Sequence, residues 1–455
     1  MNRSRYGLKI LGWCCLMLLL GYVMVQARNQ QLVSEVNHPK WSYSASIYEV
    51  NIRQYTPEGT FRAFEKRLPE IKALGTDIIW LMPIHPIGKL NRKGRFGSYY
   101  SVADYLAVNP EFGTAEDFRA LVKTIHQMGM RVILDWVANH TAWDHAWTQT
   151  HPDYYTRDSL GNLIAPVADW SDVIDLNYEN RDLWKSMTEA LVYWIREYDI
   201  DGYRCDVAAM VPTEFWNQAR AELDKIKPVF MLAEAHEPEL HIKAFDMTYN
   251  WQFKDLANNI AAGKQTAEDF WKLAAKQQMI YPENSFRMSF ITNHDENTWH
   301  GTVGERLGVG CEAFSVLITL MEGMPLIYSG QEAGLDKRLQ FFERDPIEWK
   351  QTPLRPLFSR LLELKKKNRA LWNGNRGGRM IRISDQPGIL AFLRHSGKHR
   401  VVAVVNLSDS LQTVTLTHDK LKGKYRELAG NQKIKLGDRE TMELAPWQYR
   451  VFYTY

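Results

Sequence analysis

Short apolar runs alternate with longer amphipathic stretches between about residue 46 and residue 372. Eight of the apolar runs have the length and β-branched character of strands, and they cover residues 47–52, 77–82, 131–136, 202–206, 229–233, 244–248, 287–292 and 326–328. Apolar residues recur at helical spacing between them, over residues 61–74, 114–128, 182–198 and 213–225. Strands that are mostly followed by helices predict an α/β fold, a parallel (β/α)8 or TIM barrel, rather than an open sheet.

Two segments depart from this alternation. Residues 141–177 contain Trp, Asp, Pro and Gly with little periodicity, and a connection this long inside a compact domain is usually functional. We therefore predict a small insertion there, covering one side of the barrel mouth.

After residue 375 the apolar residues alternate with a period of two, in short runs separated by turn signals. We predict a barrel domain over residues 41–372 and a C-terminal antiparallel β-sandwich over residues 376–455. Its predicted strands cover residues 380–384, 389–394, 400–406, 412–416 and 449–453.

The N-terminal residues have a different character. Basic residues precede an apolar run over residues 10–25, and small residues follow it at Val25-Gln-Ala27. This layout predicts a signal peptide over residues 1–27 and export to the periplasm or the cell exterior. A permanent membrane anchor is the alternative, because about sixteen apolar residues approach the length of a membrane span. Cleavage would leave Cys205 and Cys311, which we expect to be buried free thiols.

Composition narrows the choice of partners. The 455-residue chain has 45% apolar residues, 24% charged residues and a net charge of +3, as is ordinary for a soluble globular enzyme. A charge this small favours neither nucleic acid nor an anionic membrane surface as a partner. The sequence has no Cys/His spacing typical of zinc sites. We expect no organic cofactor, no membrane partner once the leader is cleaved, and a monomer.

Polar groups stand at the ends of four predicted strands. These segments are residues 135–140, 202–206, 232–234 and 292–295. A charged residue at the end of a buried strand is costly unless it is paired or functional. A structural ion pair would explain any one of these segments. Four that converge on one mouth of a barrel favour an active site, because such barrels carry their chemistry there.

Strand alternation places Arg204 and Asp206 on one face of the fourth strand. A neighbouring arginine lowers the pKa of a carboxylate, so we expect Asp206 to be ionised, as a nucleophile must be. Glu234 follows an apolar run, and apolar surroundings raise the pKa of a carboxylic acid, which suits a general acid. Retaining glycosidases use such a pair about 5 Å apart.

The four segments, in this order, resemble the signature regions of the α-amylase family of glycoside hydrolases, in a bacterial-type member with a short insertion. The similarity covers essentially the whole chain after the leader. It implies Asp206 as the nucleophile, Glu234 as the general acid/base and Asp295 as the stabiliser of the transition state. The resemblance also implies contacts to the sugar on the non-reducing side of the scissile bond from Tyr100, His140, Arg204 and His294. Among these, Tyr100 matches an aromatic platform.

The sequence departs from the family pattern in places. Ala209 and Met210 stand where many relatives have a Lys-His pair that helps hold sugar on the reducing side. This departure favours short α-glucans or maltooligosaccharides at least as much as raw starch. Asn139 and Asp175 match calcium positions of the family, so the resemblance is compatible with a bound Ca²⁺ ion but does not require one. We expect residues 331–349 to shape the wall opposite the insertion.

Three functions are compatible with these motifs. The first is hydrolysis of α-1,4-glucosidic bonds through a covalent glycosyl-enzyme. The second is α-glucan transglycosylation or disaccharide isomerisation, which shares that intermediate and differs only in the acceptor. The third is a non-catalytic, membrane-tethered partner protein; relatives of that kind lose catalytic carboxylates, whereas this chain keeps all three. For the C-terminal module, a structural role is favoured over starch binding.

Overall fold

The computed structural model describes residues 32–455, so the predicted leader over residues 1–27 lies outside the described residues. The barrel strands are β1 (Ile47–Val50), β2 (Ile78–Leu81), β3 (Arg131–Trp136), β6 (Gly202–Cys205), β7 (Phe230–Ala233), β8 (Met247–Tyr249), β9 (Phe286–Ser289) and β10 (Met324–Tyr328). They are parallel and close in the order β1-β10-β9-β8-β7-β6-β3-β2. The predicted TIM barrel is confirmed.

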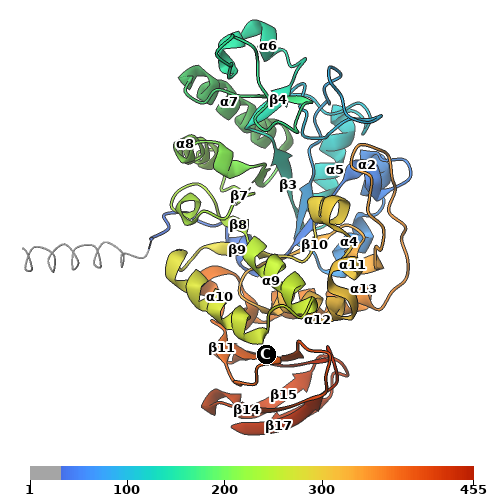
Figure 1. The fold of residues 1–455 in the computed structure, drawn as a ribbon, viewed down its shortest axis with the longest axis vertical. Coiled ribbons are helices and arrows are strands. Elements are labelled where there is room, and N and C mark those ends of the chain that lie inside the picture. The colour runs from blue at the N-terminus through green and yellow to red at the C-terminus, as the bar shows by residue number, and fades with distance from the viewer. Residues whose placement is uncertain (1–31) are drawn as a thin grey trace, which may run out of the picture.

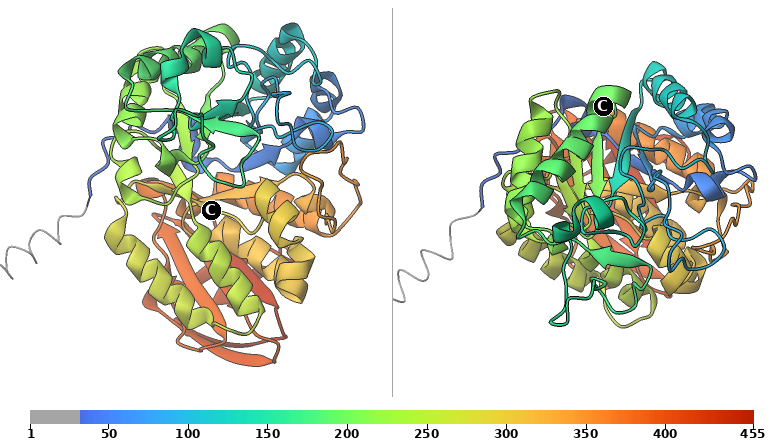
Figure 2. Two further views of the ribbon diagram at one scale, coloured as in Figure 1. Left: turned by 45° about the horizontal axis from the view of Figure 1, so that its top comes forward. Right: turned by 90° about the horizontal axis from the view of Figure 1, so that it is seen from above.

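Helices surround this barrel (Figures 1 and 2). They are α2 (Ile52–Tyr55), α3 (Phe61–Glu65), α4 (Leu68–Leu74), α5 (Ala115–Gln127), α7 (Arg181–Tyr198), α8 (Thr213–Asp224), α9 (Trp251–Ala261), α10 (Ala267–Ile280), α11 (Val303–Leu307), α12 (Cys311–Leu320) and α13 (Leu354–Lys367). The amphipathic pattern explains their orientation. In α5, Thr114 and Asp117 form a capping box, and Phe118, Leu121 and Ile125 turn the apolar face to the core.

The predicted helix over residues 61–74 is wrong in one respect, because it is broken between α3 and α4. Pro69 lies in the first turn of α4, and proline can neither donate a backbone hydrogen bond nor continue a helix through its interior. The first strand also ends earlier than predicted. The Asn51 side chain accepts a hydrogen bond from the Arg53 N–H and caps α2, so the chain leaves the sheet at that residue.

The insertion after β3 is present. Its strands β4 (His140–Ala142) and β5 (Val173–Asp175) pair antiparallel, with the short helix α6 (Trp147–Thr150) between them. In Figure 1 it occupies the end of the molecule opposite the C-terminal sheets. It covers one side of the barrel mouth, as predicted, because several of its residues line the cleft described below.

The C-terminal module contains eight strands. They are β11 (Ile381–Arg382), β12 (Ile389–Ser396), β13 (His399–Asn406), β14 (Gln412–Thr417), β15 (Gly423–Glu427), β16 (Lys433–Leu436), β17 (Arg439–Leu444) and β18 (Tyr449–Thr454). The sheets have the orders β11-β12-β13-β18-β15-β16 and β14-β17, and one apolar core joins them. The predicted antiparallel sandwich is confirmed, but β15, β16 and β17 were missed. Their outward positions are charged, so the runs lack the apolar density of the other strands.

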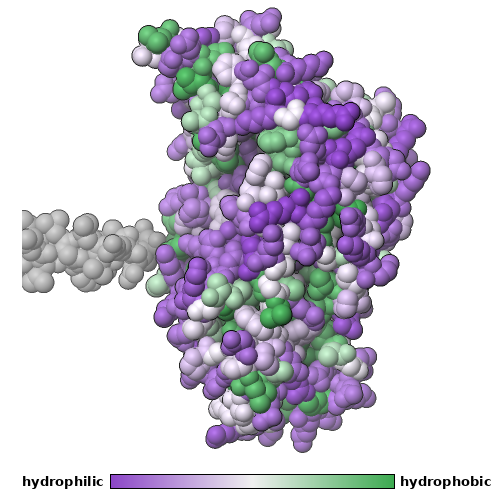
Figure 3. Space-filling model, turned by 45° about the vertical axis from the view of Figure 1, so that its right-hand side comes forward, coloured by the Kyte–Doolittle hydropathy of each residue, from purple (hydrophilic) through white to green (hydrophobic). Residues whose placement is uncertain are grey.

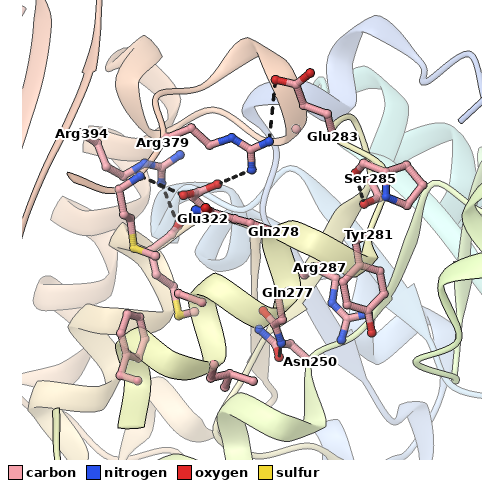
Figure 4. A pocket seen from close by; sticks show the side chains of 18 of the residues that line it. Asn250, Gln277, Gln278, Tyr281, Glu283, Ser285, Arg287, Glu322, Arg379 and Arg394 are labelled. Atoms are coloured by element: carbon pink, nitrogen blue, oxygen red, sulfur yellow. Dashed lines mark hydrogen bonds and ion pairs between the residues drawn. The ribbon is translucent and has the colours of Figure 1, made fainter. Parts of the chain in front are cut away.

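The module is attached at the base of the barrel, where the strands begin. Arg394 is buried there and donates to the carbonyls of Leu320, Met321, Trp372 and Gly378 at 2.7–3.2 Å. Arg379 bonds to Glu322, which lies just before β10, at 3.0 Å. Figure 4 shows these groups around a small pocket between barrel and module. Burial lowers the pKa of Arg394 to about 10, and the carbonyl oxygens compensate its desolvation.

Cys205 is a buried free thiol, as expected, whereas Cys311 at the start of α12 is free but only partly buried. Over residues 32–455, none of the helices has the length and apolar character of a membrane span.

Candidate active site

A cleft of about 480 Å³ lies at the mouth of the barrel. The sequence-predicted residues that line it are Tyr100, His140, Asp206, Glu234, His294 and Asp295. Arg204, which is 0% exposed, lies beneath them and contacts the carboxylates of Asp206 and Glu234. The strand ends thus bring together all seven predicted catalytic and sugar-contacting residues, as parallel strands of a closed barrel must.

Arg204 is the centre of the site. Its Nη1 lies 2.8 Å from Asp135 Oδ1 and 2.9 Å from Asp206 Oδ1. Its Nη2 lies 2.8 Å from Glu234 Oε2. The sheet register explains the arrangement, since Arg204 pairs with Asp135 on β3 and Leu232 on β7. One guanidinium therefore holds Asp206 and Glu234 close together, as the pair of a retaining glycosidase must be.

The pKa of Asp206 corrects the sequence-based expectation. Burial raises it well above its usual value, Arg204 opposes this shift, and the carboxylates of Glu234 and Asp135 raise it further. Burial also raises the pKa of Glu234 against the effect of Arg204. The sequence places one arginine beside one aspartate, whereas in the folded barrel Arg204 faces three carboxylates. Asp206 and Glu234 consequently titrate as a coupled pair, and a proton held by Glu234 favours the ionised form of Asp206.

The backbone of Val207 is strained, and its N–H group donates a hydrogen bond to Glu234. Val207 has φ 37° and ψ 46°, a left-handed conformation that β-branched residues rarely adopt and that costs about 1–3 kcal/mol. Its N–H donates to Glu234 Oε2 at 2.8 Å, and the N–H of Ala208 donates to the Glu234 carbonyl at 3.2 Å. The turn after the predicted nucleophile thus fixes the predicted acid.

His294 connects a buried carboxylate to the cleft. Its Nδ1 lies 2.5 Å from Glu49 Oε1, and Glu49 on β1 is 0% exposed. Its Nε2 lies 3.2 Å from Asp295 Oδ2 and 2.8 Å from the Tyr100 hydroxyl. Burial by itself would lower the pKa of His294, but Asp295 and Glu49 outweigh it and raise the pKa well above the usual value. The surroundings of His294 therefore favour its protonated, imidazolium form.

Asp295 has the opposite balance from Asp206. Burial would raise its pKa, but His294 and Arg204 outweigh burial and hold the pKa below its usual value, with a further contribution from a hydrogen bond of Trp299. Asp295 is therefore the carboxylate of the cleft whose environment favours negative charge.

Replacing Glu49 with glutamine is expected to lower the pKa of His294. An NMR titration of the His294 ring should then give a pKa lower by about one unit or more, as removing an opposite charge at contact distance does. Glu332→Gln is the matched control, because Glu332 is also a buried carboxylic acid but bonds to the Tyr48 hydroxyl. A pKa of His294 that is the same in Glu49→Gln and in the unmodified protein would contradict this interaction.

Comparison with known families agrees with this geometry. Residues 34–161 and 167–369 match the family model described as Alpha amylase, catalytic domain. The chain belongs to the α-amylase family. Residues 379–451 match the model described as Maltogenic Amylase, C-terminal domain.

Individual relatives are similar over different shares of this α-amylase-family chain. The crystal structure of an α-amylase from Lactobacillus plantarum is 31% identical, with TM-score 0.81, over 92% of this chain and 100% of that one. Alpha-amylase MalA of Haloarcula japonica is 25% identical over 86% of this chain, which spans 60% of that relative's length. An α-1,4-glucan:maltose-1-phosphate maltosyltransferase of Rhodospirillum rubrum is 33% identical over 45% of this chain and 33% of its own length.

The α-amylase-family cleft also has an aromatic flank. Tyr100 stacks on His294 with ring centroids 5.6 Å apart and on Phe341 at 6.1 Å. Trp299, 51% exposed, packs on Phe341 at 5.5 Å. On the facing side the ring centroids of His140 and Trp170, which belongs to the insertion, lie 5.5 Å apart. Burial lowers the pKa of His140 to about 3, so its imidazole is neutral. Rings on both flanks suit a sugar substrate.

Sequence reasoning missed several residues of this α-amylase-family site. Glu49 was detectable, because a carboxylate alternates with apolar residues inside a buried strand. Trp299 gave no periodic signal, because it belongs to a π-helix (Glu296–His300), and such turns are rare and frequent at functional sites. Lys93 and Asp172 lie in irregular loops, where only the tertiary fold determines what meets.

The family's calcium positions lie in a separate pocket. Asn139 and Asp175 line it together with the insertion's Arg157 and with Met210. Within residues 32–455, no group of three or more His, Cys, Asp or Glu side chains could hold a metal ion. The amide and carboxylate oxygens are of the type that Ca²⁺ prefers, but the ion takes 6–8 oxygens, so backbone carbonyls and water would have to supply most of them.

Proposed function

We propose that the protein is a retaining glycoside hydrolase that cleaves α-1,4-glucosidic bonds of α-glucans or maltooligosaccharides. The observation that carries this proposal is the bridging of Asp206 and Glu234 by the two terminal nitrogens of Arg204, at 2.9 and 2.8 Å. The two carboxylates are thereby held close together at the mouth of an α-amylase-family barrel, with different partners.

In the first step Asp206 attacks the anomeric carbon. Glu234 gives its proton to the departing glycosidic oxygen, the glycosidic bond breaks, and a covalent glycosyl ester forms on Asp206. In the second step the Glu234 carboxylate takes a proton from water, and the water oxygen attacks the anomeric carbon. The ester bond breaks, Asp206 is released, and two inversions give an α-anomeric product.

The remaining residues stabilise the charge that develops between these steps. Asp295 is ionised, and an oxocarbenium-like transition state is stabilised by a nearby negative charge. His294 and His140 donate to hydroxyls of the sugar on the non-reducing side, and Tyr100 lies against its face. Arg204 orients the two reacting carboxylates and limits their mutual repulsion.

A product time course tests the proposed function. Protein lacking residues 1–27 is incubated with maltoheptaose, starch, sucrose and trehalose, and products are followed by chromatography and proton NMR. Shorter α-anomeric maltooligosaccharides are expected. Products longer than the substrate would instead establish transglycosylation, the class of reaction that the name of the maltosyltransferase relative gives for that protein. Isomerised disaccharides would establish a disaccharide isomerase. No turnover of any substrate would contradict an enzymatic role.

We propose further that the protein is exported and degrades α-glucans outside the cytoplasm as a monomer. On the face drawn in Figure 3, hydrophilic side chains predominate and hydrophobic ones form small separate groups, which favours a monomer. Intact mass of the protein from the native host, and light scattering, test both proposals. An uncleaved leader in the membrane fraction, or a stable dimer, would contradict them.

We also propose that Asn139 and Asp175 bind one Ca²⁺ ion that stabilises the fold. Chelation should then lower Tm by several degrees, since a ligand present at a hundred times its Kd stabilises by about 2.7 kcal/mol. Added Ca²⁺ should restore Tm, and Asp175→Asn should abolish the response. Asp158→Asn is the control, because Asp158 is an exposed carboxylate of the same insertion. A Tm insensitive to chelator would contradict calcium binding.

A further inference from the structure

The cleft runs across the barrel mouth between two different ends. Asp206, Val207 and Glu234 follow β6 and β7 at one end. Lys93 lies in the loop after β2, and Phe342 in the loop after β10. Because β10, β1 and β2 stand opposite β6, β7 and β8 in the closed barrel, these two loops form the end of the cleft farthest from the acid Glu234.

At that far end the loop over residues 93–97 bridges both neighbouring walls. Lys93 Nζ lies 3.2 Å from Asp172 Oδ1 of the insertion and also donates to the carbonyl of Asp169. On its other side the Phe96 N–H donates to the Phe342 carbonyl at 3.1 Å. The Arg95 N–H donates to Glu343 Oε1 at 2.9 Å. The loops after β2, β3 and β10 are thus joined into one wall, which we call the bridge.

The bridge is fixed from below and tightly packed. Arg53, 0% exposed, donates to the carbonyls of Phe96 and Gly97 at 3.2 and 3.0 Å and pairs with Glu111 at 3.0 Å. Gly94 has φ +62°, and a Cβ at this position would lie 2.4 Å from the Phe342 Cβ. Only glycine permits this approach. Both observations indicate a permanent wall.

At the other end of the cleft, the loops after β6 and β7 are joined by the hydrogen bonds of the Val207 and Ala208 N–H groups to Glu234. Within residues 32–455, no ion pair joins residues 206–212 to residues 234–237. Beyond Val207 the chain continues to Met210, which is 45% exposed, and beyond Glu234 to His236, whose side chain is also exposed. Chemistry then orients the substrate. The general acid protonates the oxygen that leaves with the reducing-end portion, so that portion extends past Glu234 toward this exposed side. The portion transferred to Asp206 points toward Tyr100 and the bridge.

We propose that the bridge makes the protein exo-acting: it binds the non-reducing terminus of an α-glucan and releases a short product of one size. This inference rests on the proposed function and adds the end from which the chain is cleaved. Lys93 and Phe342 are its specificity-determining residues, because they close the path that an internal chain segment would have to follow. The exposed side near Met210 accepts acceptor portions of varied length.

The test compares two 4-nitrophenyl maltoheptaosides, one free at its non-reducing end and one carrying a 4,6-O-ethylidene group there. The ethylidene group would have to occupy space that the bridge fills. The blocked substrate should therefore be cleaved at least about tenfold more slowly. Products are separated by chromatography without coupling enzymes. Equal rates on both substrates would overturn the proposal, whereas absence of cleavage of either would overturn the proposed function itself. The ratio of the cleavage rates of the free and the blocked substrate, measured on the unmodified protein, is sufficient to test exo action.

Variants then assign the wall to its residues. Lys93→Ala/Phe342→Ala should bring the two rates to within about threefold of each other, as removal of a steric barrier predicts. Lys89→Ala is the matched control, because Lys89 is an exposed lysine on the same connection, and it should keep the unmodified ratio. A double variant that still rejects the blocked substrate would overturn the assignment to these two residues.

Discussion

Asp206→Asn is expected to lower kcat on maltoheptaose by a factor of about 10⁴ or more, as loss of a catalytic nucleophile does. Asparagine has the shape of aspartate and can still accept the hydrogen bond from Arg204 Nη1, which lies 2.9 Å from Asp206 Oδ1. It cannot form the glycosyl ester. The fold should therefore persist while the first step is lost. Near-ultraviolet circular dichroism and calorimetry check the fold, and product chromatography gives kcat.

Stability adds a second readout to this variant. The folded protein raises the pKa of Asp206 above its usual value, chiefly by burial. Folding then favours the protonated carboxyl, so its contribution is present at acidic pH and is lost as pH rises toward the folded pKa. Asparagine removes this loss, so the Tm of Asp206→Asn should rise relative to the unmodified protein between acidic and neutral pH. A Tm difference that shrank with rising pH would contradict the raised pKa.

Asp224→Asn is the matched control for the loss of activity. Asp224 also lies beside an arginine, 2.8 Å from Arg220 Nε, but on the outer helix α8. Its replacement should leave kcat unchanged. If Asp206→Asn retained more than about a tenth of the unmodified turnover, Asp206 would not be the nucleophile.

The sequence predicts the positions of the catalytic groups better than their protonation. Asp206 and Glu234 directly follow β6 and β7, and Asp295 lies in the loop that follows β9. They could be found because each comes after an apolar strand, and parallel strands of a barrel end at one mouth. The predicted pKa direction of Asp206 was wrong because it depends first on how deeply the folded barrel buries this carboxylate, and then on how many carboxylates surround Arg204. Asp135 and Glu234 belong to other strands, and their distances to the guanidinium arise only when the barrel closes.

The same distinction holds for the cleft walls. Strand alternation carries no information about the bridge, since Lys93 meets Asp172 and Phe96 meets Phe342 across long stretches of sequence. The sequence shows a glycine at position 94, but it does not show that this glycine packs against the side chain of Phe342. Local pattern therefore indicates the chemistry of this protein, whereas the end from which it cleaves a chain depends on loop contacts.

Glu234→Gln is expected to lower kcat on maltoheptaose by about 10²–10⁴, the usual contribution of a positioned general acid. Glutamine keeps the hydrogen bond from the Val207 N–H, which lies 2.8 Å from Glu234 Oε2, but it has no proton to give. It also removes a carboxylate that raises the pKa of Asp206. The change therefore lowers the pKa of Asp206 and favours its ionised form, which is the form able to attack.

The leaving group distinguishes this variant from Asp206→Asn. Nitrophenolate departs without protonation, so Glu234→Gln should still form the glycosyl ester from a 4-nitrophenyl maltoside. Hydrolysis of that ester requires the same carboxylate as a base, so stopped-flow absorbance should show a burst of nitrophenol followed by a slow phase, and mass spectrometry should show the glycosylated protein. Asp206→Asn should give neither. Glu239→Gln, an exposed glutamate on the same loop, should behave as the unmodified protein. Glu234→Gln is then compared on maltoheptaose, whose leaving group needs a proton, and on the 4-nitrophenyl maltoside, whose leaving group does not. If the variant lost the same factor in the rate of the first step on both substrates, Glu234 would not be the general acid.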